Sequence, residues 1–179
     1  PGDLDLDGAE DFAIARNDAL VELRSGRTGS ILRTHLGPPG SGGMNVVALG
    51  DVDADGIGDY VVGSAVARNS ALGLRSANAG WCGVYSGSSG ALIWQAYGSH
   101  WYQEFGGMMA DAGDLDGDGF PDLVVGTVEF GWPGSERGSG RVVAYDGRSG
   151  RQLWVVYGSN TPVLEGFGYR VASCRGDMD

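Results

Sequence analysis

The stretch GDLDGDGFPDL at residues 113–123 decides the fold, because the chain repeats it. The same frame, DxDxDGxxD, reads GDVDADGIGDY at residues 50–60 and GDLDLDGAEDF at residues 2–12, and a shortened copy, GDMD, occupies residues 176–179. Self-similarity at intervals of about 50 to 60 residues is the signature of a repeat architecture. The chain is therefore expected to be a series of one small structural unit.

A second element follows each complete acidic stretch. It is a glycine turn between two partly apolar runs, and it reads RSGRTGSIL from Arg24, YSGSSGALIW from Tyr85 and YDGRSGRQLW from Tyr145. Each copy predicts a strand, a tight turn and another strand.

Two further strands are expected around the acidic loops. Those before a loop cover residues 44–49, 108–112 and 169–174, and those after a loop cover 60–65 and 123–128. The latter are apolar at consecutive positions, as in strands covered on both faces, and helical periodicity is absent. Stacked four-stranded sheets are propeller blades, so the prediction is an all-β fold, a β-propeller segment of four-stranded antiparallel blades.

The repeat divides this segment into two complete blades and two partial ones. Residues 1–179 are expected to form part of one propeller, with complete blades at 41–103 and 104–164, a partial blade at 1–40 and the start of a truncated blade at 165–179. Propellers close with about four blades or more. We therefore expect the chain to be a piece of a longer propeller and to pack against its remaining blades.

Composition excludes several classes of partner. The 179 residues carry a net charge of −11 and no lysine, so nucleic acid and anionic membrane surfaces are not expected as partners. No apolar run approaches the ~20 residues of a membrane helix, which argues against membrane insertion. Cys82 and Cys174 are too few for a disulfide scaffold and are expected as small buried residues.

The acidic loops have the chemistry of a calcium site. Ca2+ takes about six to eight oxygen ligands, and a tight loop with carboxylates on alternate residues gathers oxygens around one point. The predicted side-chain ligands are Asp3, Asp5, Asp7 and Asp11, then Asp51, Asp53, Asp55 and Asp59, then Asp114, Asp116, Asp118 and Asp122, with Asp177 and Asp179 in the shortened copy. The backbone carbonyls of Ala9, Ile57 and Phe120 are predicted as additional ligands. We expect the calcium to be structural rather than signalling.

An EF-hand shares this frame, but it needs a bidentate glutamate at its last position and a helix on either side. That position here holds Ile14, Val62 or Val125, which are apolar strand residues. The loops are therefore expected between the first and second strands of the blades.

The order of these elements resembles the FG-GAP repeats of integrin alpha subunits and their bacterial relatives. The resemblance rests on the acidic loops, the apolar strands after them, the pairs Phe105-Gly106 and Phe167-Gly168, and the glycines Gly63 and Gly126 near the strand ends. Those ends read GSA and GTV in place of GAP. The resemblance implies a calcium-binding adhesion module of a secreted or cell-surface protein, extracellular and not an enzyme, that binds a protein or glycan.

A ligand is expected on the face opposite the calcium loops, where the loops between second and third strands and the connections between blades lie together. Loops on a rigid scaffold commonly carry function, and arginine and aromatic residues are enriched in binding hot spots. The candidates in these loops are Arg68, Arg75, Trp101, Tyr102, Phe130, Trp132 and Arg137.

A cofactor enzyme is the alternative hypothesis. The glycine-turn element also resembles the tryptophan-docking repeat AxDxxTGxxxW of quinoprotein dehydrogenases, and the matching residues are Ala144, Asp146, Ser149, Gly150 and Trp154, with Gly90 and Trp94 as a partial match. This resemblance implies a propeller enzyme that holds pyrroloquinoline quinone. No nucleophile, HExxH or phosphate-loop motif accompanies it, and tryptophans wedged between blades explain the same pattern without a cofactor.

Overall fold

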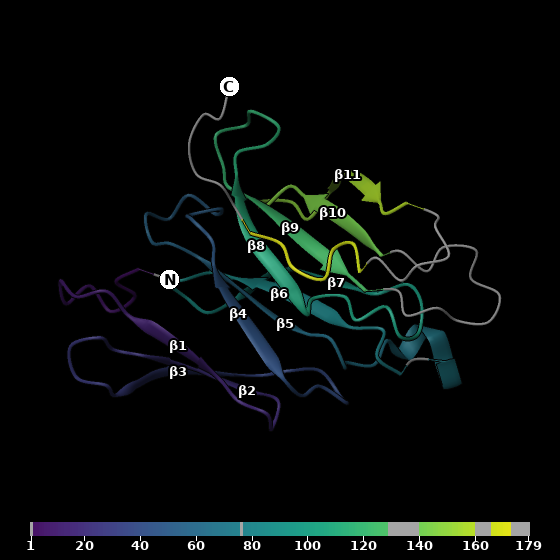
Figure 1. Cartoon of the computed structure of the whole chain (residues 1–179). Coiled ribbons are helices and arrows are strands. Elements are labelled where there is room, and N and C mark those ends of the chain that lie inside the picture. The colour runs from purple at the N-terminus through teal and green to yellow at the C-terminus, as the bar shows by residue number, and fades with distance from the viewer. Residues whose placement is uncertain (1, 76, 129–139, 160–165, 173–179) are drawn as a thin grey trace.

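The computed structural model describes residues 2–75, 77–128, 140–159 and 166–172, and these residues form three antiparallel sheets (Figure 1). The first sheet has the order β1 (Phe12–Ala15), β2 (Leu20–Arg24), β3 (Ile31–Leu36). The second runs β4 (Met44–Ala48), β5 (Tyr60–Ser64), β6 (Trp81–Tyr85), β7 (Leu92–Tyr97), and the third runs β8 (Met108–Gly113), β9 (Asp122–Thr127), β10 (Arg141–Tyr145), β11 (Gln152–Tyr157). One short 3-10 segment, η1 (Ser70–Arg75), lies between β5 and β6. The predicted all-β segment of four-stranded antiparallel blades is confirmed.

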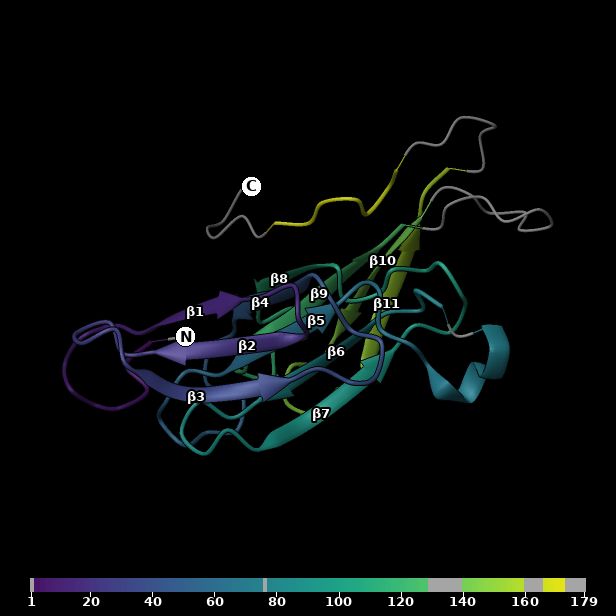
Figure 2. The same ribbon diagram turned by 90° about the horizontal axis from the view of Figure 1, so that it is seen from below.

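The sheets stack face to face, with the second between the first and the third (Figures 1 and 2). Tyr60 and Val62 of β5 lie in a buried cluster with Val21 of the first sheet, while Val61 lies in another cluster with Leu123 of the third. All five side chains are fully buried. Successive side chains of a strand point to opposite faces, so a strand between two cores is apolar at consecutive positions.

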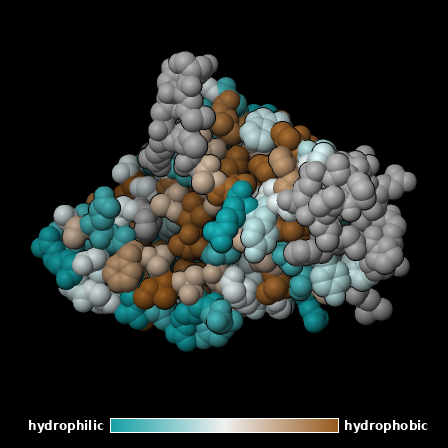
Figure 3. All heavy atoms as spheres, viewed as in Figure 1, coloured by the Kyte–Doolittle hydropathy of each residue, from teal (hydrophilic) through white to brown (hydrophobic). Residues whose placement is uncertain are grey.

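The strands that approach one another most closely across the stack are β1, β4 and β8, since β4 contacts both of the others. They lie on the face seen in Figure 1, and Figure 3 shows hydrophobic residues gathered along the middle of that face, over β4 and β8. Their neighbouring placement is what blades around a common axis require.

One side chain from each of the first two sheets reaches the glycine turn of the next sheet. The indole Nε1 of Trp94 in β7 donates to the carbonyl oxygen of Gly147 at 2.6 Å. In the equivalent place, the guanidinium of Arg33 in β3 donates to the carbonyl oxygen of Gly87 at 3.0 Å. Trp94 is therefore a wedge between sheets, as predicted, and Trp154 of the third sheet is 40% exposed.

The strand expected at residues 169–174 is not formed in its described part. Residues 169–172 are bends and irregular backbone, and residues 173–179 lie outside the described chain. The corresponding strands β4 and β8 each pair with the strand after an acidic loop.

His35 joins the first and second sheets. Its Nε2 shares a hydrogen bond with the Tyr60 hydroxyl, and its ring lies 4.3 Å from the ring centroid of Tyr85. Burial first, and then the positive charge of Arg33, lowers the pKa of His35 from 6.5 to about 4. The folded protein therefore holds a neutral imidazole at neutral pH.

This lowered pKa predicts a pH dependence of stability. Above pH 6.5 the imidazole is neutral in both states, whereas between pH 6.5 and about 4 it binds a proton mainly in the unfolded chain. Stability is thus lost as the pH falls through this window. His35→Gln is expected to reduce the loss between pH 7 and pH 4.5 by about 1 kcal/mol, a value discounted because His35 is only half-buried. Urea unfolding of both proteins at the two pH values measures this, and equal losses would contradict it.

None of the helices in the described part of the chain has the length and hydropathy to span a bilayer. Cys82 is a free, buried thiol, and its burial raises its pKa to about 12. A thiol with such a pKa is a small apolar core residue, as predicted for it. Cys174 lies outside the described residues.

Candidate metal-binding loops

Three acidic loops share one backbone design: the first loop (residues 3–11), the second (51–59) and the third (114–122). The leading aspartate folds each loop back on itself. In the second loop, Asp51 Oδ1 accepts from the Asp55 amide at 3.1 Å, and its Oδ2 accepts from the Gly56 amide at 2.8 Å. The corresponding bonds recur at Asp3 and Asp114. Self-closure of this kind turns the carboxylates toward a common centre.

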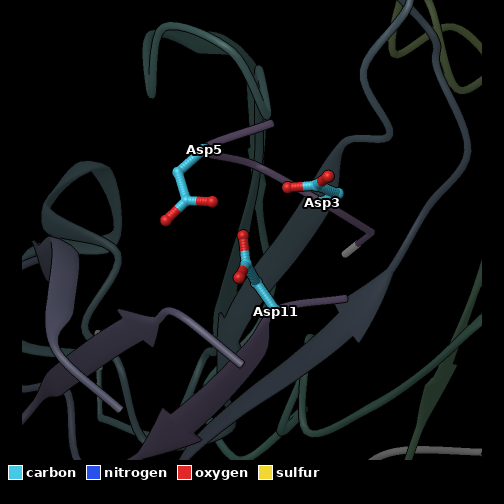
Figure 4. A group of neighbouring side chains, drawn as sticks. All are labelled: Asp3, Asp5 and Asp11. Atoms are coloured by element: carbon cyan, nitrogen blue, oxygen red, sulfur yellow. The ribbon is translucent and has the colours of Figure 1, made fainter. Parts of the chain in front are cut away.

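Each loop gathers three carboxylates, with one oxygen from each lying within 4.8 Å of the others. The groups are Asp3, Asp5 and Asp11; Asp51, Asp53 and Asp59; and Asp114, Asp116 and Asp122. Figure 4 shows the three side chains of the first loop turned toward a common space. Three convergent carboxylates are the donor set that a hard divalent cation prefers, so these residues fit calcium.

The third aspartate of each loop stands apart from these groups. Asp7, Asp55 and Asp118 each use Oδ1 to accept the amide two residues ahead at 2.9 Å. Their ligand role, and that of the carbonyls of Ala9, Ile57 and Phe120, stays a prediction.

The last aspartate clips each loop to the glycine turn of the same sheet. Asp59 is fully buried, and its Oδ2 accepts from the Val52 amide while its Oδ1 accepts from the Gly87 amide, both at 2.7 Å. Asp11 makes the same pair of bonds to Leu4 and Gly26, and Asp122 makes it to Leu115 and Gly147. Acidic loops and glycine turns therefore lie at one end of the sheets.

Burial and hydrogen bonding act oppositely on the pKa values of these carboxylates. Burial raises the pKa of Asp59 and of Asp122. Partial desolvation, followed by the charges of Asp7 and Asp11, raises the pKa of Asp5, as expected for crowded carboxylates. The Ser88 hydroxyl lowers the pKa of Asp55.

A further acidic group adjoins the third loop and was missed from the sequence. Asp146, in the glycine turn after β10, lies with Asp116 and Asp118 within the same 4.8 Å. Its Oδ1 also accepts the amides of Arg148 and Ser149 at 3.0 and 2.9 Å. The match to the tryptophan-docking repeat at this aspartate therefore has a structural explanation, because the side chain caps its own turn.

The opposite end of the sheets carries part of the predicted partner surface. The loop before β6 and the connection before β8 lie side by side, because the Asn69 amide group donates to the Gly98 carbonyl at 2.8 Å and the Tyr102 amide donates to the Ala77 carbonyl at 3.0 Å. Arg68 and Tyr102 are exposed there, and the Trp101 ring contacts Tyr102.

Of the remaining predicted partner and metal residues, only the backbone of Arg75 lies within the described chain. The backbone of Arg75 lies in η1, which Figure 1 shows at the end of the molecule away from the acidic loops. The residues outside the described chain are Phe130, Trp132, Arg137, Asp177 and Asp179.

Stacked four-stranded sheets with acidic loops at one end define a β-propeller segment with candidate cation sites. The family model of the FG-GAP repeat matches residues 110–145, which include the third acidic loop. The predicted resemblance is thereby confirmed, and the chain carries the FG-GAP repeat found in integrin alpha subunits.

Comparison with known proteins agrees with this family. Integrin alpha-5 of Xenopus laevis is 27% identical over 143 residues, and integrin alpha-8 of Mus musculus is 31% identical over 144 residues. These matches include 69% and 74% of this chain but only 14% and 13% of the relatives' lengths. The chain thus corresponds to a small part of those proteins.

Solved structures share the fold. A rhamnogalacturonan lyase of Bacillus licheniformis superposes with a TM-score of 0.57 at 17% identity, covering 91% of this chain and 34% of the lyase. An exotype rhamnogalacturonan lyase superposes with a TM-score of 0.56 at 20% identity, covering 93% and 33%. At such low identity the likeness concerns the fold alone.

Proposed function

We propose that this chain is a calcium-stabilised part of an FG-GAP β-propeller in a secreted or cell-surface protein, where it binds a protein or glycan ligand. The observation that carries the proposal is the threefold recurrence of a convergent carboxylate group in a chain with an FG-GAP repeat. A bound divalent cation would offset the repulsion between the three carboxylates of each group. The complete blades are proposed at residues 41–103 and 104–164, the partial blade at 1–40 and the truncated one at 165–179.

The calcium is proposed to be structural. Each cation would be held by the first two aspartates of a loop together with the last aspartate, which is hydrogen-bonded to the glycine turn, and so would hold two parts of one sheet together. With a site at the tight end of extracellular affinities, about 2 mM calcium would contribute ~1.8 kcal/mol per loop.

Ligand binding is proposed for the end away from the acidic loops. Arg68, Trp101 and Tyr102 offer cationic and aromatic surface on loops that are hydrogen-bonded to one another. Integrin alpha relatives favour adhesion over catalysis, so we propose a binding module and not an enzyme. The quinoprotein alternative gains no specific support, because Trp94 and Asp146 are both engaged in packing and turn formation.

Calcium is expected to raise the melting temperature of the chain. Saturating three loops at about 1.8 kcal/mol each would raise it by roughly 10 °C or more, and magnesium would raise it less because it demands a tighter octahedral site. Thermal unfolding followed by circular dichroism with calcium, with magnesium or with chelator measures this. Identical curves in calcium and chelator would contradict the structural role.

A further inference from the structure

The glycine turns reach the acidic loops with different side chains. The residue after the first turn glycine is Arg27, Ser88 or Arg148, and the fourth residue beyond that glycine is Ser30, Ala91 or Arg151. The three loops therefore have the same aspartates but different neighbours.

An arginine occupies one carboxylate of the first loop. Arg27 Nε lies 3.2 Å from Asp7 Oδ2, and the Arg27 guanidinium also donates to the Asp7 backbone carbonyl. Because Asp7 Oδ1 accepts the Ala9 amide, both oxygens of this predicted ligand are engaged. A cation that takes Asp7 as a ligand has to displace the guanidinium.

In the third loop, an arginine of the glycine turn again pairs with a carboxylate, but with a different aspartate of the frame. Arg151 Nη2 lies 3.0 Å from Asp116 Oδ2, and Asp116 belongs to the convergent group. The other arginine of this turn also reaches the third loop, but without an ion pair to an aspartate of the described chain, since the Arg148 guanidinium lies 4.5 Å from the centre of the Phe120 ring.

The second loop has neutral partners instead. The hydroxyls of Ser86 and Ser88 both donate to Asp55 Oδ2. Among the described residues, no arginine forms an ion pair with Asp51, Asp53, Asp55 or Asp59. A hydroxyl can stay beside a metal-bound carboxylate, whereas a guanidinium repels the incoming cation.

We propose that Arg27 and Arg151 compete with calcium for the first and third loops, so that the second loop binds calcium most tightly and fills first. This inference rests on the proposed calcium-binding function. An exposed arginine–carboxylate pair contributes little by itself, and its removal is expected to tighten the loop about fivefold. The chain would then take up calcium in steps, starting at its central sheet.

The test uses calcium titrations of the full chain, followed site by site in 1H–15N correlation spectra. The amides of Gly8, Gly56 and Gly119 report the three loops, because each donates to the leading aspartate of its loop at 2.8 to 2.9 Å. We expect the Gly56 signal to shift at the lowest calcium concentration.

Exchanging arginine and serine between the first and second glycine turns makes the test specific. Arg27→Ser is expected to lower the midpoint at Gly8 about fivefold, and Ser88→Arg is expected to raise the midpoint at Gly56 by a similar factor. Arg151→Gln should act on Gly119 alone. The matched control is Arg148→Ser, which removes the same charge from a turn without breaking an ion pair to its loop, and which should leave all three midpoints within about twofold.

The outcomes separate this inference from the function on which it rests. If all three glycines respond to calcium at one midpoint, and the exchanges do not move it, arginine competition is wrong while calcium binding stands. If no glycine responds to calcium, both are wrong. If Arg148→Ser acts as strongly as Arg27→Ser, general charge and not competition sets the affinities, and the inference is again overturned.

Discussion

Replacing Gly87 with alanine is expected to lower the free energy of unfolding by about 3 kcal/mol or more. A Cβ atom at Gly87 would lie 2.0 Å from the Gly58 backbone carbonyl oxygen, far closer than a non-bonded carbon and oxygen can approach. Relief requires the turn to move away from the acidic loop, which also breaks the hydrogen bond from the Gly87 amide to Asp59.

A glycine in open space is the control for this change. Gly29 has a φ of +71° and nothing within 4 Å of its would-be Cβ, so Gly29→Ala pays only the cost of a left-handed backbone, about 1 kcal/mol. Chemical denaturation of both variants without calcium compares the two costs. Equal losses would show that the turn does not press against the acidic loop.

The second large effect is expected from Asp59→Ala. This change removes the acceptor of two amides, those of Val52 and Gly87, in a place where Val52 and Asp59 are fully buried. Leaving two buried donors unpaired costs about 3 kcal/mol in total, whether or not calcium is present.

Asp53→Ala is the matched change within the same loop. Asp53 is solvent-accessible, and its Oδ1 accepts only the Asp55 amide, at 3.2 Å. Without calcium the variant should lose no more than about 0.5 kcal/mol, but it should lose the calcium-dependent part of its stability. Unfolding curves with calcium and with chelator distinguish the two aspartates. An Asp59→Ala protein as stable as the parent in chelator would contradict the claim that Asp59 holds the second loop against the glycine turn.

The fold was predictable because its signals are periodic. Acidic loops and glycine turns recur in phase, and the consecutive apolar residues of β5 are explained by two cores on either side of it. The strand expected at residues 169–174 is not formed over 169–172, the part of it that the structure describes.

The site was predictable only in part. The frame identifies the aspartates, but it treats all four of a loop alike. The structure instead gathers Asp51, Asp53 and Asp59 into one group and leaves Asp55 outside it, and it shows that Asp59 also bonds to the glycine turn. Asp146 and Arg27 escaped prediction because their partners are distant in sequence and no local pattern marks them. The available signal was that a glycine turn follows every complete acidic loop, although the interval from the last aspartate to the first turn glycine varies, being 15, 28 and 25 residues.

Calcium uptake by the purified chain tests the central claim most directly. Equilibrium dialysis at saturating calcium, followed by metal analysis, should find three ions per chain in the described loops, and a variant with alanine at Asp5, Asp53 and Asp116 should retain none of them. A parent chain that holds no more calcium than the surrounding buffer would contradict the claim that these loops are cation sites.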